Sequence, residues 1–364
     1  MRRTEGIGIA LLVALSVVPA AAEDWCHPRG DCRNTGVTKN HGPKRRPHVI
    51  WSREEPSDIM GPAAVKGGWV YYAVGSRLLR ARARASGREG WGKEVKQAVL
   101  AAPSIDGEFL YVGGQDGVHY CLRLEDATEP GGACLVADGP ILAAAAVAPP
   151  RWFEGGTDGF FYAIATEESR LLWRREIGPT SLAAALGRRA VFAVNDAGTL
   201  YALDPKRGTR RWKLETKQSP LCAPILGKHD LFLATRDTLL RVDPKTGKQT
   251  GTYATPGLCA APVLWKETLY YPTDHGEIVA LDLQRGEPRT RIKPDKSAPA
   301  IATPLVLAHG ILFGCAEATL FAVDPKKNKL LWTWKAPAVL TPPAVCDKGI
   351  YVGAGRTFYL LRYK

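Results

Sequence analysis

The sequence has little that favours helices. Its 364 residues include 27 prolines and 37 glycines, which interrupt it at short intervals, and no window shows sustained 3.6-residue hydrophobic periodicity. It also lacks an apolar stretch of about 20 residues, the length that a membrane-spanning helix needs. These absences disfavour helical folds and membrane-spanning helices, and they predict a soluble, all-β mature chain.

Local motifs for catalysis or cofactor binding are absent as well. There is no Gly-x-Ser-x-Gly, Walker or dinucleotide-binding motif, and no Cys-x-x-Cys-His segment for c-type haem. The spacing of Cys26, His27, Cys32 and His41 matches no common zinc site. We therefore predict no catalytic residue, no cofactor and no metal ligand, and we favour a function other than catalysis.

The first 22 residues have the features of a signal peptide. Arg2 and Arg3 give a positive start, residues 7–18 are mostly apolar, and residues 20–22 are alanines. The first cysteine, Cys26, follows Glu-Asp-Trp instead of the small residues of a lipid-attachment site. We expect cleavage after this segment, export to the periplasm or the medium, and no lipid anchor.

Acidic residues are scarce relative to basic ones. The whole chain has 49 basic and 36 acidic residues; the first 22 residues hold two of the arginines and one of the glutamates, so the mature part carries a net charge of +12. Such a balance favours anionic partners. Because export separates the chain from nucleic acid, we expect an envelope protein or an anionic envelope surface as the partner.

Eight cysteines are present, and an oxidising compartment permits disulfides between them. Two pairs are close in sequence: Cys26 with Cys32 around a short loop, and Cys121 with Cys134 on the arms of an expected hairpin. Spacing does not determine connectivity, and buried free thiols are the alternative.

A repeat of about 40 residues runs through the chain, a period typical of propeller blades. The second residue of an aromatic strand recurs every 38 to 42 residues, at Tyr71, Tyr111, Phe153, Phe192, Phe232, Tyr270, Leu312 and Tyr351. A tryptophan near the end of the unit follows the same period, at Trp51, Trp91, Trp173, Trp212 and Trp332. We expect these tryptophans to be structural anchors that pack between neighbouring units, and not to contact a cofactor.

Each unit is expected to contain four strands. Asp-Gly turns within 111–122 and 153–164 predict hairpins, because glycine accepts the positive φ of a tight turn. The Asp-Pro-Lys-x-Gly turns at 204–208 and 243–247 predict a second reversal. A run rich in alanine and proline before each aromatic strand suits an innermost strand, where strands crowd around an axis.

Eight such units predict an eight-bladed β-propeller over residues 48–364, preceded by a leader segment at 23–47. The last unit, 349–364, stops before its tryptophan strand, whereas residues 48–54 are a tryptophan strand without a unit. We expect these two ends to share the eighth blade, because pairing them closes the ring and removes an open sheet edge.

These units resemble the PQQ-like repeat family, whose unit reads aromatic-Val-Gly-x-x-Asp-Gly-x-Leu-Tyr-Ala-Leu-Asp-x-x-x-Gly-x-x-x-Trp. Residues 25–36 are similar to that family's Trp-x-x-x-Arg-Gly-x-x-x-x-Thr-Gly leader. By length and architecture the resemblance is nearest to BamB-like proteins, which implies an exported scaffold associated with outer-membrane protein assembly. Longer relatives are quinoprotein dehydrogenases, which implies the alternative function: binding of a small ligand or of pyrroloquinoline quinone with Ca²⁺.

The quinone alternative needs oxygen ligands and a carboxylate base near the axis. The expected innermost strands offer mainly alanine, proline, leucine and valine, with Asp106 just past the end of one. Acidic and histidine side chains also occur in the turns between the second and third strands, at Asp116, Asp158, Asp196, Asp274 and His275. Aspartate at such positions is first of all a turn former, so we favour a scaffold without a cofactor.

The turns between the third and fourth strands are basic in several units. They carry Lys206, Arg207, Lys245, Arg285, Lys326 and Lys327. Equivalent turns of a propeller project from the same face, so these residues form a candidate docking face, and Arg80, Arg82 and Arg84 are expected to add charge. The commoner role of such residues is to keep a β-rich surface soluble. We expect a monomeric interaction scaffold.

Overall fold

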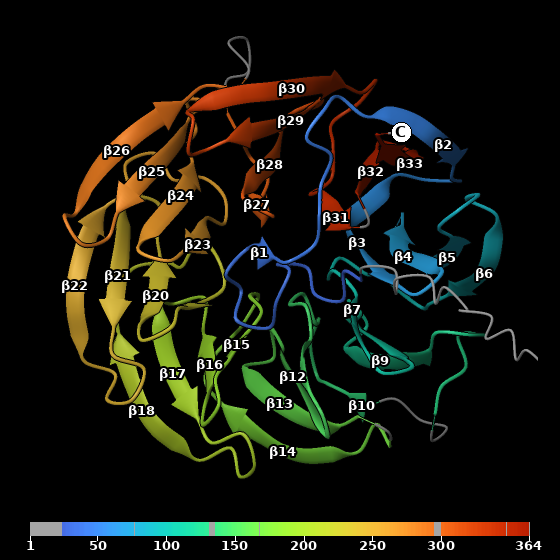
Figure 1. The fold of residues 1–364 in the computed structure, drawn as a ribbon. Coiled ribbons are helices and arrows are strands. Elements are labelled where there is room, and N and C mark those ends of the chain that lie inside the picture. Colours follow the sequence, from blue (N-terminus) through green and yellow to red (C-terminus); the bar gives the residue numbers. More distant parts are fainter. Residues whose placement is uncertain are drawn as a thin grey trace, which may run out of the picture.

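The chain forms a closed ring of eight sheets, seen along its axis in Figure 1. The computed structural model describes residues 24–75, 77–130, 135–166, 168–294, 300–346 and 348–363; the expected signal peptide lies outside these ranges. Within them the chain contains strands and no helix, hence no helix long and apolar enough to cross a membrane. The predicted all-β, eight-bladed propeller is confirmed.

Seven blades consist of strands that follow one another in sequence, the first strand of each being nearest the axis. The strands of the first four blades are, in blade 1, β3 (Ile59–Lys66), β4 (Trp69–Val74), β5 (Leu78–Ala83) and β6 (Glu89–Glu94); in blade 2, β7 (Ser104–Asp106), β8 (Phe109–Gly113), β9 (Val118–Arg123) and β10 (Leu135–Val136); in blade 3, β11 (Ala146–Ala148), β12 (Arg151–Gly155), β13 (Phe160–Ala165) and β14 (Leu171–Glu176); and in blade 4, β15 (Ala185–Leu186), β16 (Val191–Val194), β17 (Thr199–Leu203) and β18 (Arg210–Glu215). The next three are, in blade 5, β19 (Ile225–Leu226), β20 (Leu231–Ala234), β21 (Thr238–Val242) and β22 (Gln249–Ala254); in blade 6, β23 (Val263–Trp265), β24 (Thr268–Pro272), β25 (Ile278–Asp282) and β26 (Glu287–Ile292); and in blade 7, β27 (Val306–Ala308), β28 (Ile311–Ala316), β29 (Thr319–Asp324) and β30 (Lys329–Lys335).

Burial within a blade follows distance from the axis. In blade 4 every residue of β16 is buried, because both of its faces pack against neighbouring blades. The outermost strand, β18, alternates exposed and half-buried residues, the pattern of a strand that is covered on one side. A bulge after Ala202 shifts the register of β17 on β18, and the same irregularity recurs after Ala163, Ala280 and Ala322.

The eighth blade joins the two ends of the propeller, as predicted. Strand β2 (His48–Glu54) pairs antiparallel with β33 (Thr357–Arg362), which continues to β32 (Gly349–Ala354) and β31 (Ala344–Cys346). Trp51 lies opposite Leu360 in this pairing. The ring is therefore closed by hydrogen bonds between segments about 300 residues apart, without an exposed sheet edge at the junction.

The leader lies across the centre of the ring, where Figure 1 shows it in blue around β1 (Val37–Thr38). Its backbone carbonyls accept hydrogen bonds from the inner segments of seven blades. The donor and acceptor pairs are Val65 to Trp25, Ile105 to Cys26, Leu186 to Cys32, Leu226 to Arg33, Leu264 to Thr35, Leu307 to Gly36 and Lys348 to His41. Because the leader bonds to so many blades, it acts as a central plug.

The candidate disulfide between Cys26 and Cys32 is not formed in the structure, which has the alternative of free thiols. Both are free cysteines in the structure. Cys26 packs with the apolar cluster of blades 1 and 2, and Cys32 packs with the cluster of blades 3 and 4. The leader is stretched between these two places, which separates the thiols. The other expected pair is untested, because Cys134 lies outside the described residues.

Candidate docking face

The six predicted docking residues lie in equivalent turns along an arc of four adjacent blades. Lys206 and Arg207 belong to blade 4 and Lys245 to blade 5; Arg285 belongs to blade 6, and Lys326 and Lys327 to blade 7. All six side chains are exposed. In an antiparallel blade the turns between strands 1 and 2 and between strands 3 and 4 lie at the same end. We call this end of the ring the basic face.

An aspartate holds each of these basic turns in shape. The carboxylate of Asp243 accepts the backbone N–H of Lys245 at 2.8 Å, and Asp324 accepts those of Lys326 and Lys327 at 3.0 and 3.1 Å. The hydrogen bond from Lys245 lowers the pKa of Asp243, and the hydrogen bonds from Arg289 lower the pKa of Asp282. The aspartates fix the turns, while the lysine and arginine side chains extend into solvent.

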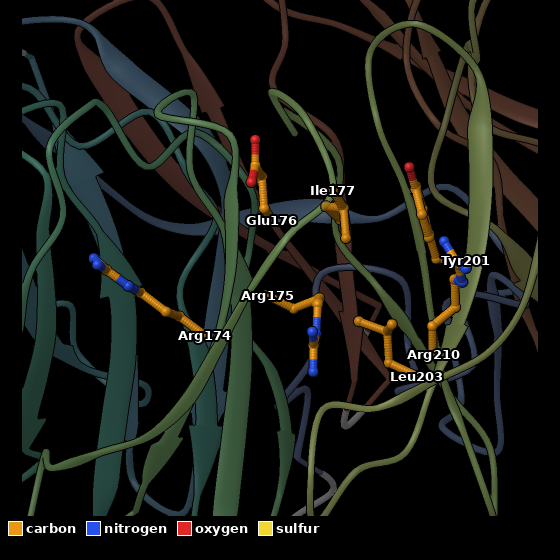
Figure 2. Close-up of a pocket in the computed structure, with 7 residues that line it drawn as sticks. All are labelled: Arg174, Arg175, Glu176, Ile177, Tyr201, Leu203 and Arg210. Atoms are coloured by element: carbon orange, nitrogen blue, oxygen red, sulfur yellow. The ribbon is translucent and has the colours of Figure 1, made fainter.

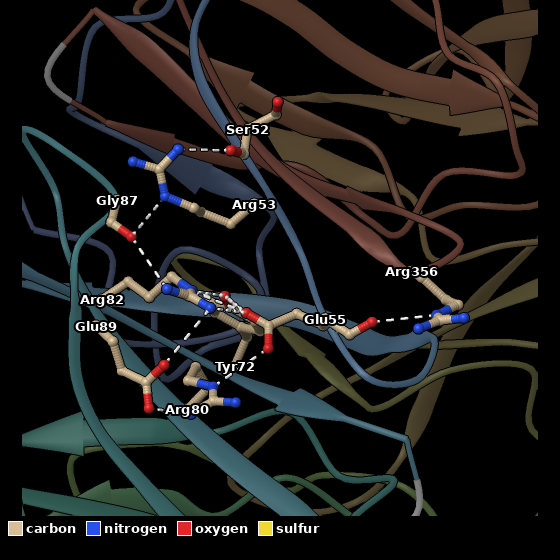
Figure 3. Close-up of polar contacts among 9 residues, drawn as sticks. All are labelled: Ser52, Arg53, Glu55, Tyr72, Arg80, Arg82, Gly87, Glu89 and Arg356. Atoms are coloured by element: carbon tan, nitrogen blue, oxygen red, sulfur yellow. Dashed lines mark hydrogen bonds and ion pairs between the residues drawn. The ribbon is translucent and has the colours of Figure 1, made fainter.

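The expectation that Arg80, Arg82 and Arg84 add charge to the surface is wrong. Figure 3 shows Arg80 and Arg82 turned toward Glu55, which is 2% exposed. Arg82 Nη2 lies 2.6 Å from Glu55 Oε1, and Arg80 Nε lies 3.2 Å from Oε2. Arg84 is buried and donates to the Gly67 carbonyl at 2.7 Å. Arg80 and Arg82 thus neutralise a buried carboxylate, Arg84 bonds to the backbone, and none of the three is part of the docking face.

The five predicted tryptophans link neighbouring blades. In each, the indole N–H donates to a backbone carbonyl at 2.8–3.3 Å, and in four of the five that carbonyl belongs to the next blade. The pairs are Trp51 to Arg84, Trp91 to Leu124, Trp173 to Pro205, Trp212 to Pro244 and Trp332 to Pro43. Trp332 differs from the others because its acceptor, the Pro43 carbonyl, belongs to the leader. The leader thus replaces the third-to-fourth turn that the two-ended blade 8 lacks.

A glycine in the receiving turn makes room for the indole in blades 4 and 5. A Cβ at Gly208 would lie 2.6 Å from the Trp173 ring, and one at Gly247 would lie 2.6 Å from the Trp212 ring. Both glycines have φ values that side chains disfavour, +66° and +74°. The glycine of the Asp-Pro-Lys-x-Gly turn therefore serves the turn and the interblade contact together.

The groove drawn in Figure 2 lies at the seam of blades 3 and 4, beside these contacts. Its volume is about 440 Å³, and its walls are Arg174, Arg175, Glu176, Ile177, Tyr201, Leu203 and Arg210. Arg175 donates to the Gly208 carbonyl at 2.9 Å, and the Arg174 guanidinium lies 4.6 Å from the centre of the Phe160 ring. These arginines are engaged with the protein itself, and none of the predicted docking residues lies here.

The axial residues do not fit a quinone and its cation. Asn34 of the leader donates to the carbonyls of Ala184 and Pro224 at 3.1 Å each, and Arg29 donates to those of Pro262 and Leu305. Polar groups at the axis are thus bonded to one another, and the inner strands beside them present alanine. Across the described ranges no three acidic, histidine or cysteine side chains gather as metal ligands would. We derive no reaction step through such a group.

The aspartates considered for that alternative are engaged by other groups of the protein. Asp116 accepts the backbone N–H of Val118 at 3.1 Å, and Asp196 accepts the N–H and hydroxyl of Ser181. Asp158 accepts the Tyr162 hydroxyl, and Asp274 pairs with Arg236 at 3.1 Å. These turns lie at the end of the ring opposite the basic face.

A buried histidine–glutamate pair was not predicted from the sequence. His119 of β9 and Glu154 of β12 are 0% and 1% exposed, and Nδ1 lies 2.6 Å from Oε2. Burial raises the pKa of the Glu154 carboxyl, opposed by the hydrogen bond from His119. The pair bridges blades 2 and 3. In the sequence it could have been noticed only as one polar residue among mainly apolar and aromatic neighbours in each of the two strands.

A family model described as outer membrane protein assembly factor BamB matches residues 45–129 and 157–354, most of the chain. No curated protein matches the sequence. Solved structures show similar folds. BamB from Moraxella catarrhalis is 15% identical with a TM-score of 0.70, over 87% of this chain and 98% of that chain.

Two enzymes have the same ring. Quinohemoprotein alcohol dehydrogenase from Comamonas testosteroni is 12% identical with a TM-score of 0.77, over 93% of this chain and 80% of that chain. A europium-containing methanol dehydrogenase is 12% identical with a TM-score of 0.75, over 94% and 98%. At such identities these structures establish the eight-bladed fold, and the function has to be argued from the residues of the chain.

Proposed function

Because this chain belongs to the family described as outer membrane protein assembly factor BamB, we propose that it is a non-enzymatic scaffold in outer-membrane protein assembly. In this proposal the chain is exported through its N-terminal segment, resides in the periplasm as a monomer and docks an acidic envelope protein. Its rigid ring supplies a surface, and association needs no chemistry at the axis.

The observation that supports this proposal most is the asymmetry of charge between the two ends of the ring. Six exposed basic side chains occupy one arc of the basic face, on turns that aspartates hold in place. The turns at the opposite end carry Asp116, Asp158, Asp196, Asp237 and Asp274. A surface of one sign steers a partner of the opposite sign and fixes its orientation.

Charge reversal on this arc tests the proposal. The variant Lys206→Glu, Arg207→Glu, Lys245→Glu, Lys327→Glu should reduce the amount of an envelope protein that co-purifies with this chain by about tenfold. The matched control reverses three exposed basic residues at the opposite end, Lys96, Lys217 and Arg236, and should retain the partner. Unchanged co-purification by a folded arc variant would contradict the docking proposal.

A further inference from the structure

In blade 6 the tryptophan position of the repeat holds no aromatic residue. Trp173, Trp212 and Trp332 lie opposite Ala163, Ala202 and Ala322 in the pairing of third and fourth strands. In blade 6 the residue opposite the corresponding Ala280 is Thr290. The fourth strand of blade 6 therefore places a small side chain where other blades insert an indole into the next blade.

Blade 5 also lacks the tryptophan but fills the position in another way. Gly251 occupies the tryptophan position, and Tyr253, two residues later, donates its hydroxyl to the Leu283 carbonyl of blade 6 at 2.8 Å. Blade 6 shows no such replacement. Instead a cleft of about 680 Å³ lies between blades 6 and 7, with Thr290 among its lining residues. We call this cleft the blade 6–7 slot.

The turn of blade 7 that faces the slot also lacks the residue that usually contacts the tryptophan. The turn of blade 7 reads Asp324-Pro325-Lys326-Lys327-Asn328, so asparagine stands where blades 4 and 5 have the glycine that contacts the indole. Asn328 keeps the positive φ of that position, 51°. At the junction of blades 6 and 7 both partners of the tryptophan–glycine contact are thus replaced, which leaves the slot open to an external group.

The walls of the slot suit an aromatic side chain beside negative charge. Trp265 and Tyr270 line it, together with Pro325. The ammonium groups of Lys266 and Lys326 lie 5.1 and 5.4 Å from the centre of the Trp265 ring, and neither forms an ion pair within the described part of the chain. Glu267 is the opposing charge on this rim, whereas Arg289 is paired with Asp282 at 2.6 Å. Two ammonium groups over one aromatic ring, without an ion pair among the described residues, favour carboxylates next to an inserted ring.

We propose that the blade 6–7 slot binds a tryptophan or tyrosine side chain from an acidic segment of a partner protein, in the place that the tryptophan of the repeat takes in other blades. The proposal deepens the docking function and depends on it only for the identity of the partner. Its structural basis is internal to the chain, because four other junctions show an indole held between a fourth strand and the third-to-fourth turn of the next blade.

The test uses a short fluorescein-labelled acidic peptide with one central tryptophan, and a second peptide with alanine in its place. Fluorescence anisotropy with the full chain should show the tryptophan peptide binding about tenfold more tightly, since an aromatic ring in a protein cleft adds more than its area alone. Equal binding of the two peptides would overturn the proposal.

A variant that fills the slot gives the second arm. Thr290→Trp with Asn328→Gly restores the tryptophan–glycine contact seen at Trp173 and Gly208, and should fold with unchanged or higher thermal stability while losing peptide binding about tenfold. Asn328→Gly alone leaves the slot open and should bind as the parent does. Equal binding by the filled and open variants would refute the assignment.

Photocrosslinking keeps the test valid if the filled variant does not fold. A benzophenone in place of the peptide's tryptophan should attach to residues that line the slot in the unaltered chain, within 265–270, 289–290 or 325–328, and attachment only outside the slot would refute it. The four-residue charge reversal leaves Lys266 and Lys326 in place. If the charge-reversal variant lost the envelope protein but the unaltered chain bound no peptide, the slot alone would be rejected. If that variant kept the envelope protein and the unaltered chain bound the tryptophan peptide, the docking arc alone would be rejected.

Discussion

Replacing Glu55 with alanine should lower the free energy of unfolding by about 3–5 kcal/mol, because it takes from Arg80 and Arg82 their one buried counter-charge and leaves only the solvent-exposed Glu89 beside them. Glu55 Oε1 also accepts the Tyr72 hydroxyl at 2.7 Å. The backbone of the same residue exchanges hydrogen bonds with Arg356 at the end of blade 8. Guanidinium chloride unfolding followed by tryptophan fluorescence measures the loss.

Glu89 provides the matched control for Glu55. It pairs with the same Arg80, but its side chain is 53% exposed. Glu89→Ala should therefore cost less than about 1 kcal/mol, the usual size for a solvent-screened pair. If both variants lost the same small amount, the Glu55 cluster would not be the polar centre of the ring junction.

Replacing Trp332 with alanine should cost about 3–5 kcal/mol, the range for truncating a buried tryptophan. The side chain is 5% exposed, its ring centre lies 6.0 Å from that of Phe313, and its N–H donates to the Pro43 carbonyl at 2.9 Å. Since Pro43 precedes β2, this one side chain ties the leader to the seam that closes the ring.

The position of the damage distinguishes this role from general core packing. Hydrogen exchange in Trp332→Ala should rise most over residues 42–54, which include β2. Trp334 lies on the same strand and is half-buried against Tyr359, so Trp334→Ala is the control and should leave exchange over 42–54 near the parent level. An increase spread evenly over all blades would contradict the proposed link between Trp332 and the seam.

The ring and its closure were predictable because their signals repeat. The tryptophan and aromatic registers share one period, and the unmatched strand at 48–54 complements the incomplete last unit. The central plug was not predictable, since the leader occurs once and its bonds are made by backbone carbonyls. Residue identity says little about such contacts.

The placement of charged side chains was the feature least predictable from the sequence. Arg80 and Arg82 look like the alternating polar residues of an exposed strand, and the acid that neutralises them, Glu55, is 25 and 27 residues away. The same limit applies to His119 and Glu154. The gaps in the tryptophan register at 251 and 290 were visible, but the sequence did not show that Tyr253 fills the first and that the second remains open.

The docking account is tested most directly by photocrosslinking from the two ends of the ring in intact cells. A photoreactive amino acid at Lys206, Lys245 or Lys327 should yield adducts with the same envelope protein, because these exposed side chains share one arc. The same amino acid at Arg236 or His275, whose side chains are 72% and 84% exposed at the opposite end, should yield none. Adducts from the opposite end alone, or from neither end, would contradict the assignment of function to the basic face.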